Sequence, residues 1–489
     1  MTYASNFTVK KLAASGAEMN PTDIRGRTPL HYLCRSSHPD SEMMKQMLEL
    51  GARIDVQDVD GVAPLYLAAL HDLESHARLL LEAGANFNLA DKTGYSPLLW
   101  AALGGATGVA QELLERMGQE GLAEKLESIR DNHGRTVLHV ASMADQASFI
   151  EWLTSLCGIS TLMQAKDNLD NTAIHLAAQV RKENAVKQLL RLRSETRVQN
   201  QSKQTPVHLA AENKFTEIVR ILFDTDDADG LLEDCGGQTP LHLAVLTGHK
   251  ETVELLLSLE SDALRIYDIR DMRPLHYAAS EGFNDIIDLL FEDQDTKTYD
   301  NEVTLLHLAA KYGHIDTVKL LVAKGVPANW IDYHDQTPLD LAIEEGHEEI
   351  VQFLLSQPDV RLEDKRGNTL LHSAAMKGHI EISRLIFDIK KEEIDVNSAN
   401  VDGQTPLHLA AEKGHSDMID FLIEVCKCDK TRRNNDGYGP LEIAESTGNH
   451  NVLTFWLTSL VSKGMWVMRG ARRMRRMHLK RYLNCQERA

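Results

Sequence analysis

The sequence predicts an all-α solenoid of helix-turn-helix units joined by β-hairpin-like turns. One tetrapeptide, Thr-Pro-Leu-His in its fullest form, recurs along almost the whole chain, as in residues 238–258 and 404–424. Asp or Asn stands five residues before its first position in twelve of thirteen copies, and Tyr299 is the exception. Self-similarity at a period of 31 to 40 residues indicates a repeat architecture. We take the first residue of the tetrapeptide as an anchor and number the repeats 1 to 13 by their anchors, Thr28, Ala63, Ser96, Thr136, Thr172, Thr205, Thr239, Arg273, Thr304, Thr337, Thr369, Thr405 and Gly439.

Each repeat divides into a turn and two helices. Asp-x-x-Gly, as in residues 58–61, favours a tight turn because the aspartate bonds its own backbone and glycine accepts a positive φ. Thr then suits the helix N-cap and Pro the first helical position. A glycine such as Gly414 suits the left-handed C-cap. The second helix follows, with apolar residues at helical spacing, such as Val253 and Leu256.

One such unit is too small to bury its apolar faces, whereas stacked units bury them against their neighbours. The pattern resembles the ankyrin repeat over residues 7–461. In that family the histidine of the tetrapeptide bonds the anchor Thr and the neighbouring backbone, which implies a structural role here rather than a ligand or catalytic one. The tetrapeptide histidines are His31, His139, His175, His208, His242, His276, His307, His372 and His408; five more follow the C-cap glycine, namely His249, His314, His347, His379 and His415.

Several repeats depart from the pattern, and we expect them to pack less well. The anchor is Ala63, Arg273 or Gly439 in three repeats. The histidine is replaced by Tyr66, Leu99, Asp340 and Glu442 in four repeats. Residues 115–128 lengthen repeat 3, so a longer helix or loop with a local kink is expected there.

The two ends of the chain differ from the array. Residues 8–20 align with residues 317–329, a second helix and its loop, so the chain starts halfway through a repeat, either as a natural half-cap or as part of a longer array. Residues 462–489 form a basic tail with nine Lys or Arg and one Glu, a net charge of +8, which leaves −28 on residues 1–461. Segregated charge of this kind is typical of an interaction tail.

The tail has several interpretations. An amphipathic helix there would suit an anionic membrane or a calmodulin-like groove, and the basic clusters also resemble a nuclear import signal. A disordered, solvated tail and docking on the acidic array are the alternatives. The candidate contact residues are Trp466, Arg472, Arg473, Arg475 and Arg476.

Composition favours a cytoplasmic location, with the nucleus as the alternative. The six cysteines have no framework of spacings and form no Cys-x-x-Cys, so we expect reduced thiols. The N-terminal residues lack the apolar core of a signal peptide, and the apolar stretch at 452–461 is too short to cross a bilayer. We expect a monomer.

No catalytic motif was found. The sequence has no phosphate-binding glycine loop, no Gly-x-Ser-x-Gly elbow, no His-Glu-x-x-His and no kinase signature. Its acidic pairs fall at turns and exposed helix faces. We therefore expect no enzyme activity, no cofactor and no metal site.

Recognition of a protein partner is the expected role. The resemblance implies that side chains four, three and one places before the anchor face ligands on a concave surface, and Tyr and Arg often anchor interfaces. The acidic array favours a partner with a basic patch and disfavours specific binding of nucleic acid. The candidate residues are Tyr95, His133, Arg135, Arg270, Met272, Tyr333, His334, Lys365, Arg366 and Tyr438.

Two functions remain open. The first is a scaffold or adaptor that holds a protein partner on the concave surface, with the tail as a second contact. The second is the cytosolic array of a larger membrane protein, such as an ankyrin-bearing transient receptor potential channel, with the tail as a juxtamembrane linker. A ubiquitin-ligase adaptor would need a docking box that is not recognised in the sequence.

Overall fold

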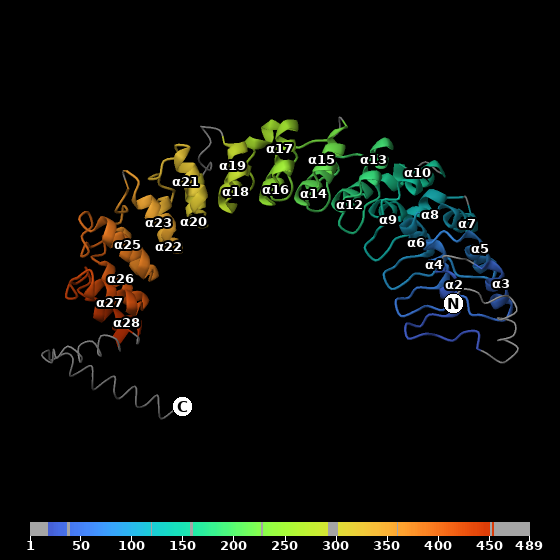
Figure 1. Ribbon diagram of the computed structural model, residues 1–489, viewed down its shortest axis with the longest axis horizontal. Helices are drawn as coiled ribbons and strands as arrows, with labels where there is room; N and C mark the ends of the chain where they lie inside the picture. Colours follow the sequence, from blue (N-terminus) through green and yellow to red (C-terminus); the bar gives the residue numbers. More distant parts are fainter. Residues whose placement is uncertain are drawn as a thin grey trace, which may run out of the picture. The chain divides into compact units, whose positions relative to one another are not determined.

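The computed structural model describes residues 18–36, 40–118, 120–156, 160–225, 228–291, 302–358, 360–449 and 452–453. Helices alternate along these residues between a first and a second helix of each repeat (Figure 1). The first helices are α2 (Pro29–Leu33), α4 (Pro64–Leu70), α6 (Pro97–Gly104), α9 (Val137–Met143), α12 (Ala173–Gln179), α14 (Pro206–Glu212), α16 (Pro240–Leu246), α18 (Pro274–Glu281), α20 (Leu305–Lys311), α22 (Pro338–Glu345), α24 (Leu370–Lys377), α26 (Pro406–Lys413) and α28 (Pro440–Thr447). Each begins one residue after its anchor.

The second helices complete the repeats. They are α3 (Ser41–Glu49), α5 (Glu74–Glu82), α7 (Thr107–Met117), α10 (Ala147–Leu156), α13 (Glu183–Arg191), α15 (Thr216–Phe223), α17 (Lys250–Leu259), α19 (Asn284–Leu290), α21 (Ile315–Ala323), α23 (Glu348–Leu355), α25 (Ile380–Lys390) and α27 (Ser416–Glu424). Two short helices, α8 (Leu122–Ser128) and α11 (Ser160–Gln164), and one 3₁₀ helix (Ser261–Arg265) are additional. The predicted all-α solenoid is confirmed.

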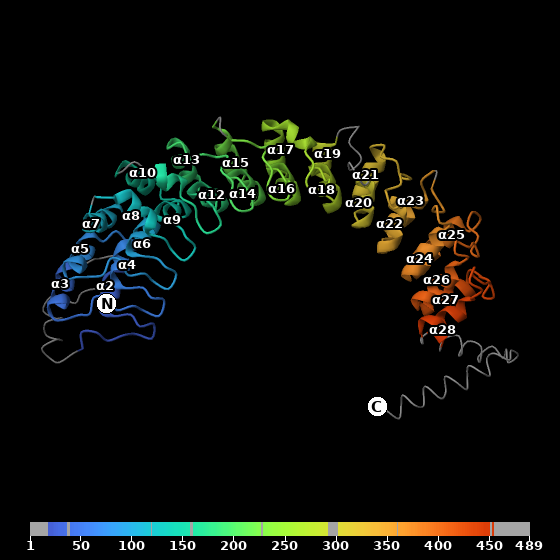
Figure 2. The ribbon, with the colours of Figure 1, turned by 180° about the vertical axis from the view of Figure 1, so that it is seen from behind.

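The chain forms two compact units. Unit 1 comprises the described part of residues 1–278 together with 285–291, and unit 2 comprises 279–284 and the described residues after 301. In unit 1 the first helices α4, α6, α9, α12, α14 and α16 pack side by side in chain order, and in unit 2 α20, α22, α24, α26 and α28 do the same (Figure 2). Paired alanines of these helices, such as Ala68 and Ala69 in α4, are fully buried and allow the close approach.

The turns before the first helices are hairpin-like in their bonding. In repeat 2, Asp58 N donates to Val62 O at 2.9 Å and Gly61 N donates to Asp58 O at 2.9 Å. The Asp58 carboxylate accepts from the amides of Asp60 and Val62, each at 3.0 Å. No strand forms among the described residues, where Glu363 and Thr369 make an isolated bridge. The turn is therefore held by one aspartate and a few backbone bonds.

Backbone hydrogen bonds connect successive turn tips through unit 1 and at two places in unit 2. In each pair an amide of the later repeat donates to a carbonyl of the earlier repeat. The bonds run from Val59 to Arg25, Lys92 to Asp60, Asn132 to Thr93, Asn168 to His133, Gln201 to Leu169, Cys235 to Ser202 and Ile269 to Gly236 in unit 1, and from Val401 to Arg366 and Asn435 to Asp402 in unit 2, with lengths of 2.8 to 3.2 Å.

The insertion in repeat 3 forms an extra helix. Residues 122–128 fold as α8, which packs against α11 of repeat 4. Leu122 and Leu126 of α8 are buried, as is Leu162 of α11. The expected lengthening of repeat 3 thus takes the form of an added helix with its own apolar contacts.

The glycine after the first helix is required for two reasons. Gly313 has φ of +84°, and a Cβ placed on it would lie 2.7 Å from Cε1 of His347 in the next repeat. That imidazole donates from Nε2 to Lys311 O at 2.9 Å. Gly325, later in the same repeat, has φ of +87° but no atom within 4 Å of such a Cβ. Gly313 therefore allows the left-handed helix cap and also leaves room for the His347 ring of the next repeat.

Aspartate replaces this glycine in two repeats. Asp72 and Asp145 adopt φ of 51° and 61°. Their carboxylates accept from Val109 N at 3.0 Å and Ala185 N at 2.8 Å, near the start of a second helix in the following repeat. A side-chain bond to the next repeat thus offsets part of the backbone strain.

No helix in the described ranges is both long and apolar enough to cross a membrane.

We predict that Gly313→Ala destabilises the protein more than Gly325→Ala. Both place alanine at a positive φ, which costs about 1 to 2 kcal/mol, but only the first also displaces His347, for a further ~1 kcal/mol or more. Urea unfolding followed by circular dichroism measures the difference. In a His347→Ala background the two substitutions should cost the same; a difference that persists there would contradict the steric explanation.

Candidate protein-binding surface

The tetrapeptide histidine joins two repeats through its two ring nitrogens. In repeat 7, Thr239 N donates to His242 Nδ1 at 3.1 Å, and Thr239 Oγ1 lies 2.9 Å from the same nitrogen. His242 Nε2 lies 3.2 Å from Met272 O of repeat 8. A backbone amide can only donate and a carbonyl can only accept, so Nδ1 is the unprotonated nitrogen and Nε2 carries the proton. The ring is held neutral in one tautomer.

The same link recurs in both units, always to the residue before the next anchor. Its members are His31 to Val62, His139 to Asn171, His175 to Gln204, His208 to Gln238 and His242 to Met272, and in unit 2 His307 to Gln336, His372 to Gln404 and His408 to Tyr438. These histidines make the structural bonds that the resemblance to the ankyrin repeat implied.

Burial disfavours the charged form of these rings. It lowers the pKa of His175, His242 and His372 to about 4, against 6.5 for an exposed histidine, and the bonds from Nε2 to backbone carbonyls only partly oppose this shift. Protonation of Nδ1 would also remove the hydrogen bond that it accepts from the threonine amide. The inter-repeat links therefore depend on neutral imidazole.

Histidines after the C-cap glycine make a second link, to the preceding repeat. His347 Nε2 lies 2.9 Å from Lys311 O, and His379 and His415 reach Glu344 O and Met376 O at 3.1 Å. His249 differs, because its Nδ1 lies 2.8 Å from Thr252 Oγ1 within its own repeat.

The departing repeats keep part of this arrangement. Asp340 Oδ2 accepts from Thr337 N at 2.9 Å, and Glu442 Oε2 accepts from Gly439 N at 2.7 Å, so each acid caps its own helix. Tyr66 and Leu99 are fully buried at the position of the imidazole. The expectation of weaker packing in these repeats stays a prediction.

Three of the predicted contact residues cluster in repeats 3 and 4. The Arg135 guanidinium lies 5.9 Å from the centre of the Tyr95 ring and bonds Asp131, with Nε 2.6 Å from Oδ2. Tyr95 and Arg135 are half-buried, whereas His133 is exposed beside them on the turn tip. These side chains come from consecutive turns, which the ladder of tip bonds places next to each other.

The remaining predicted residues of unit 1 share a single turn. Arg270 is exposed, and its amide donates to Asp268 Oδ1 at 2.8 Å. Met272 is half-buried, and its carbonyl receives the His242 link. The structure does not place this turn beside Tyr95.

In unit 2, the predicted residue Lys365 pairs with a carboxylate on the turn tip that carries Tyr333 and His334. Asp335 pairs with Arg361 at 2.7 Å and with Lys365 at 3.1 Å, and these cations hold its pKa well below the usual range. Tyr333, which is 78% exposed, packs edge-on against His334 on the same tip.

Two further predicted residues of unit 2 lie on later turns. Arg366 pairs with Asp402 at 3.1 Å. Tyr438 is exposed, two repeats after Lys365 and Arg366. The predicted tail residues Trp466, Arg472, Arg473, Arg475 and Arg476 lie outside the described residues.

Sequence reasoning missed an aromatic residue four places after the anchor. Tyr32, Trp100 and Tyr277 each donate to the aspartate of their own turn, at 2.7, 3.0 and 2.5 Å. Trp100 is half-buried and packs edge-on against Tyr95, with ring centres 6.2 Å apart. An aromatic nine residues after the turn aspartate was the available signal.

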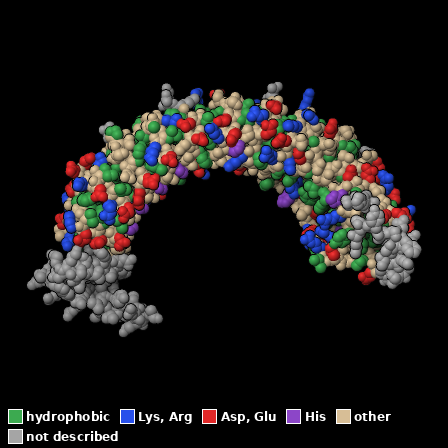
Figure 3. All heavy atoms as spheres, viewed as in Figure 1, with side chains coloured by type: hydrophobic (Ala, Val, Ile, Leu, Met, Phe, Trp, Pro, Cys, Tyr) green, Lys and Arg blue, Asp and Glu red, His purple; other side chains and the backbone are tan. Residues whose placement is uncertain are grey.

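Figure 3 shows acidic and basic side chains interspersed over the visible face of both units. The surface offers no single block of charge in that view.

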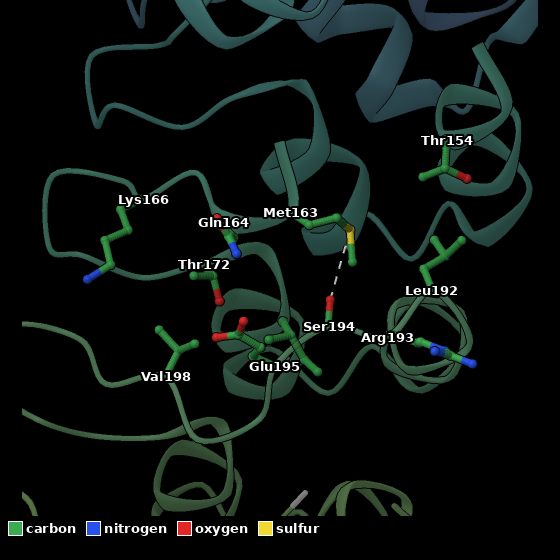
Figure 4. Close-up of a pocket in the computed structure, with 11 residues that line it drawn as sticks. Thr154, Met163, Gln164, Lys166, Thr172, Leu192, Arg193, Ser194, Glu195 and Val198 are labelled. Atoms are coloured by element: carbon green, nitrogen blue, oxygen red, sulfur yellow. Dashed lines mark hydrogen bonds between the residues drawn. The ribbon is translucent and has the colours of Figure 1, made fainter. Parts of the chain in front are cut away.

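A cleft of about 650 Å³ lies beside α10, α11 and α13 (Figure 4). Its lining mixes apolar side chains, such as Ile174 and Leu192, with polar ones. The Ser194 hydroxyl bonds the Met163 thioether at 3.9 Å rather than a histidine or carboxylate, so it is not activated as a nucleophile. Among the described residues, no group of three or more His, Cys, Asp or Glu side chains is arranged to hold a metal ion.

Comparison with known proteins identifies the repeats. A family model that represents three copies of the ankyrin repeat matches this chain five times, at residues 1–91, 77–165, 174–267, 275–364 and 355–434. The chain belongs to the ankyrin-repeat family. Ankyrin repeats imply protein–protein interaction.

Similar proteins share parts of the ankyrin array. Human transient receptor potential cation channel subfamily A member 1 is 40% identical over 86 residues, 17% of this chain and 8% of that protein. NF-kappa-B inhibitor zeta of Bos taurus is 27% identical over 229 residues, which is 43% of this chain and 29% of that protein. The probable E3 ubiquitin-protein ligase XBOS32 of Oryza sativa subsp. japonica is 40% identical over 91 residues, 18% of each chain. The chain thus spans less than a third of each relative.

We predict that the ankyrin array loses stability as the pH falls from 6.5 towards 4. The pKa of the buried histidines is lowered in the fold, so the unfolded chain takes up protons first, and the stabilisation present above pH 6.5 is lost at about 1.4 kcal/mol per pH unit for each such group. Urea unfolding at about pH 7 and about pH 5 measures this loss. His242→Gln removes one titrating group and should reduce the pH dependence by ~2 kcal/mol; an unchanged dependence would contradict the assignment.

Proposed function

We propose that the chain is a non-enzymatic scaffold or adaptor that binds a protein partner on the concave surface of its turn tips and first helices. The observation that carries this proposal is the exposure of variable tip side chains on a hydrogen-bonded ladder. Tyr438 is 52% exposed on a tip where Asn435 N donates to Asp402 O of the preceding repeat at 3.1 Å, and Tyr333 is 78% exposed on a tip where Asp335 accepts from Lys365 N of the next repeat at 2.8 Å. Large side chains on a rigid backbone lose little conformational entropy on binding.

The charge of the array supports a partner with a basic patch. Residues 1–461 carry a net charge of −28 by sequence. Complementary charge accelerates association and makes it sensitive to salt. In this proposal the protein acts in the cytosol or nucleus as a monomer, and the basic tail at 462–489 provides a second contact, with a protein or an anionic membrane.

A second candidate function is the cytosolic array of a larger membrane protein. The 40% identity with the human channel over 86 residues supports this candidate. Coding sequence downstream of Ala489 that specifies hydrophobic spans would favour it over the adaptor.

We expect a crosslinking pull-down from source-cell lysate to recover the same partners with the full chain and with a chain ending at Leu460. The reason is that the proposed contact surface lies on the array, which both chains contain. Mass spectrometry identifies the partners, and recovery should fall between low and moderate salt.

Partners recovered only with the full chain would contradict this proposal. They would make the array a spacer and the tail the binding element.

A further inference from the structure

The seventh residue after the anchor distinguishes one group of repeats from the others. It is Leu70, Leu103 and Met143 in repeats 2, 3 and 4, three consecutive apolar side chains that are all half-buried. Elsewhere an apolar residue at this position stands between polar ones, as Met376 does between Glu344 and Glu412.

Three glutamates at this position are hydrogen-bonded within their own repeat. Glu212, Glu344 and Glu412 each accept from the glutamine just before their anchor, at 3.3, 3.0 and 3.2 Å. In these repeats a hydrogen-bonded pair of Gln and Glu side chains therefore lies over the exposed face of the first helix. Repeats 3 and 4 have Tyr95 and Arg135 in place of that glutamine.

The apolar side chains lie on helices in direct contact. Helix α6 packs between α4 and α9. A Cβ on Gly104 would lie 2.1 Å from Leu70 O, so α4 and α6 meet without an intervening side chain. Gln146 Nε2 donates to Leu103 O at 3.1 Å, which ties repeat 4 to repeat 3. Leu70, Leu103 and Met143, with Tyr95 and Trp100, form what we call the apolar patch.

The aromatic members of the patch are oriented before any partner binds. Trp100 Nε1 donates to Asp91 Oδ2 at 3.0 Å, and its ring meets Tyr95 edge-on. Arg135 lies near the Tyr95 ring and its Nη1 donates to Met143 Sδ at 3.4 Å. Held side chains of these types are efficient binding anchors.

Repeats 2 to 4, which carry the patch, are acidic by sequence. Residues 51–156 contain fifteen Asp or Glu and seven Lys or Arg, a net charge of −8. The cations of the nearby tips are engaged, because Arg135 pairs with Asp131 and Lys92 Nζ donates to Val59 O at 2.6 Å. Asp60 is exposed on the neighbouring tip. A cationic segment therefore complements this region.

We propose that the apolar patch of repeats 2 to 4 is the main docking site, and that its partner is a peptide segment presenting a bulky apolar side chain flanked by Lys or Arg. This inference rests on the proposed scaffold function and assigns it a location and a partner chemistry. The apolar side chain contacts Leu103 and Met143 beside Trp100, and the flanking cations face the acidic surroundings.

The test uses a random dodecapeptide library displayed on phage and selected on the full chain. Selected peptides are synthesised, and their affinity is measured by fluorescence anisotropy at low and moderate salt. We expect a consensus with one bulky apolar residue and at least two Lys or Arg, and weaker binding at the higher salt.

The decisive variant carries Leu103→Gln and Met143→Gln. Gln179 occupies this position naturally in repeat 5, so the change keeps the charge and suits the fold. Affinity should fall at least about tenfold. Met376→Gln, the same substitution at the same position in unit 2, is the matched control and should change affinity less than about twofold.

Three results would overturn the inference: no enriched peptide, a consensus without basic residues, or equal binding to the double variant. The scaffold proposal is judged separately. If the double variant still recovers the pull-down partners, the scaffold proposal holds and its binding site lies outside the apolar patch. If no version of the chain recovers a partner, both the scaffold proposal and the docking-site inference are overturned.

Discussion

The array depends on an imidazole ring whose two nitrogens serve two different repeats. Nδ1 accepts from the anchor threonine, and Nε2 donates to the residue before the next anchor, as in the His242 link to Met272 O at 3.2 Å. Because each nitrogen has an obligatory role, the ring must be neutral and in one tautomer. The bond also determines where the next turn begins relative to the helix before it. Local helix capping and inter-repeat register thus come from the same side chain.

A second set of contacts works in the opposite direction. In unit 2, a histidine after a C-cap glycine reaches back to the preceding first helix, as His379 does to Glu344 O. That ring occupies the space where a Cβ on the preceding glycine, Gly346, would lie, at 3.0 Å. Repeats that keep both histidines, such as repeat 11 with His372 and His379, are therefore bonded to both neighbours by side chains that lie away from the tips. The side chains of the tips can vary widely because they do not make these histidine hydrogen bonds between repeats.

Repeats 2 and 3 depart from the repeat pattern at a buried position and at a partly exposed position of the first helix. Repeats 2 and 3 replace the imidazole with Tyr66 and Leu99, which are fully buried and give up the polar link. The same repeats carry Leu70 and Leu103 on the first-helix surface, where other repeats have hydrogen-bonded glutamates. Loss of the polar link and an apolar first-helix surface thus coincide in repeats 2 and 3, whereas repeat 4 keeps the His139 link beside Met143. Stability there comes from packing, and the surface left over is suited to a partner.

The sequence by itself determined the repeat pattern and the start of each first helix, because these follow from local capping and turn chemistry repeated at a near-constant period. The structural role of the histidines was implied by the resemblance to the ankyrin repeat. It indicated Tyr95 and Arg135 as surface residues, but only the tertiary structure showed that they meet. Trp100 was missed because its partner, Asp91, lies across the turn, and the apolar patch because it is assembled from three repeats. The fold of α8 against α11 was also decided by packing. The periodic sequence predicts the structure of each repeat. Contacts between repeats determine which side chains lie together at the surface.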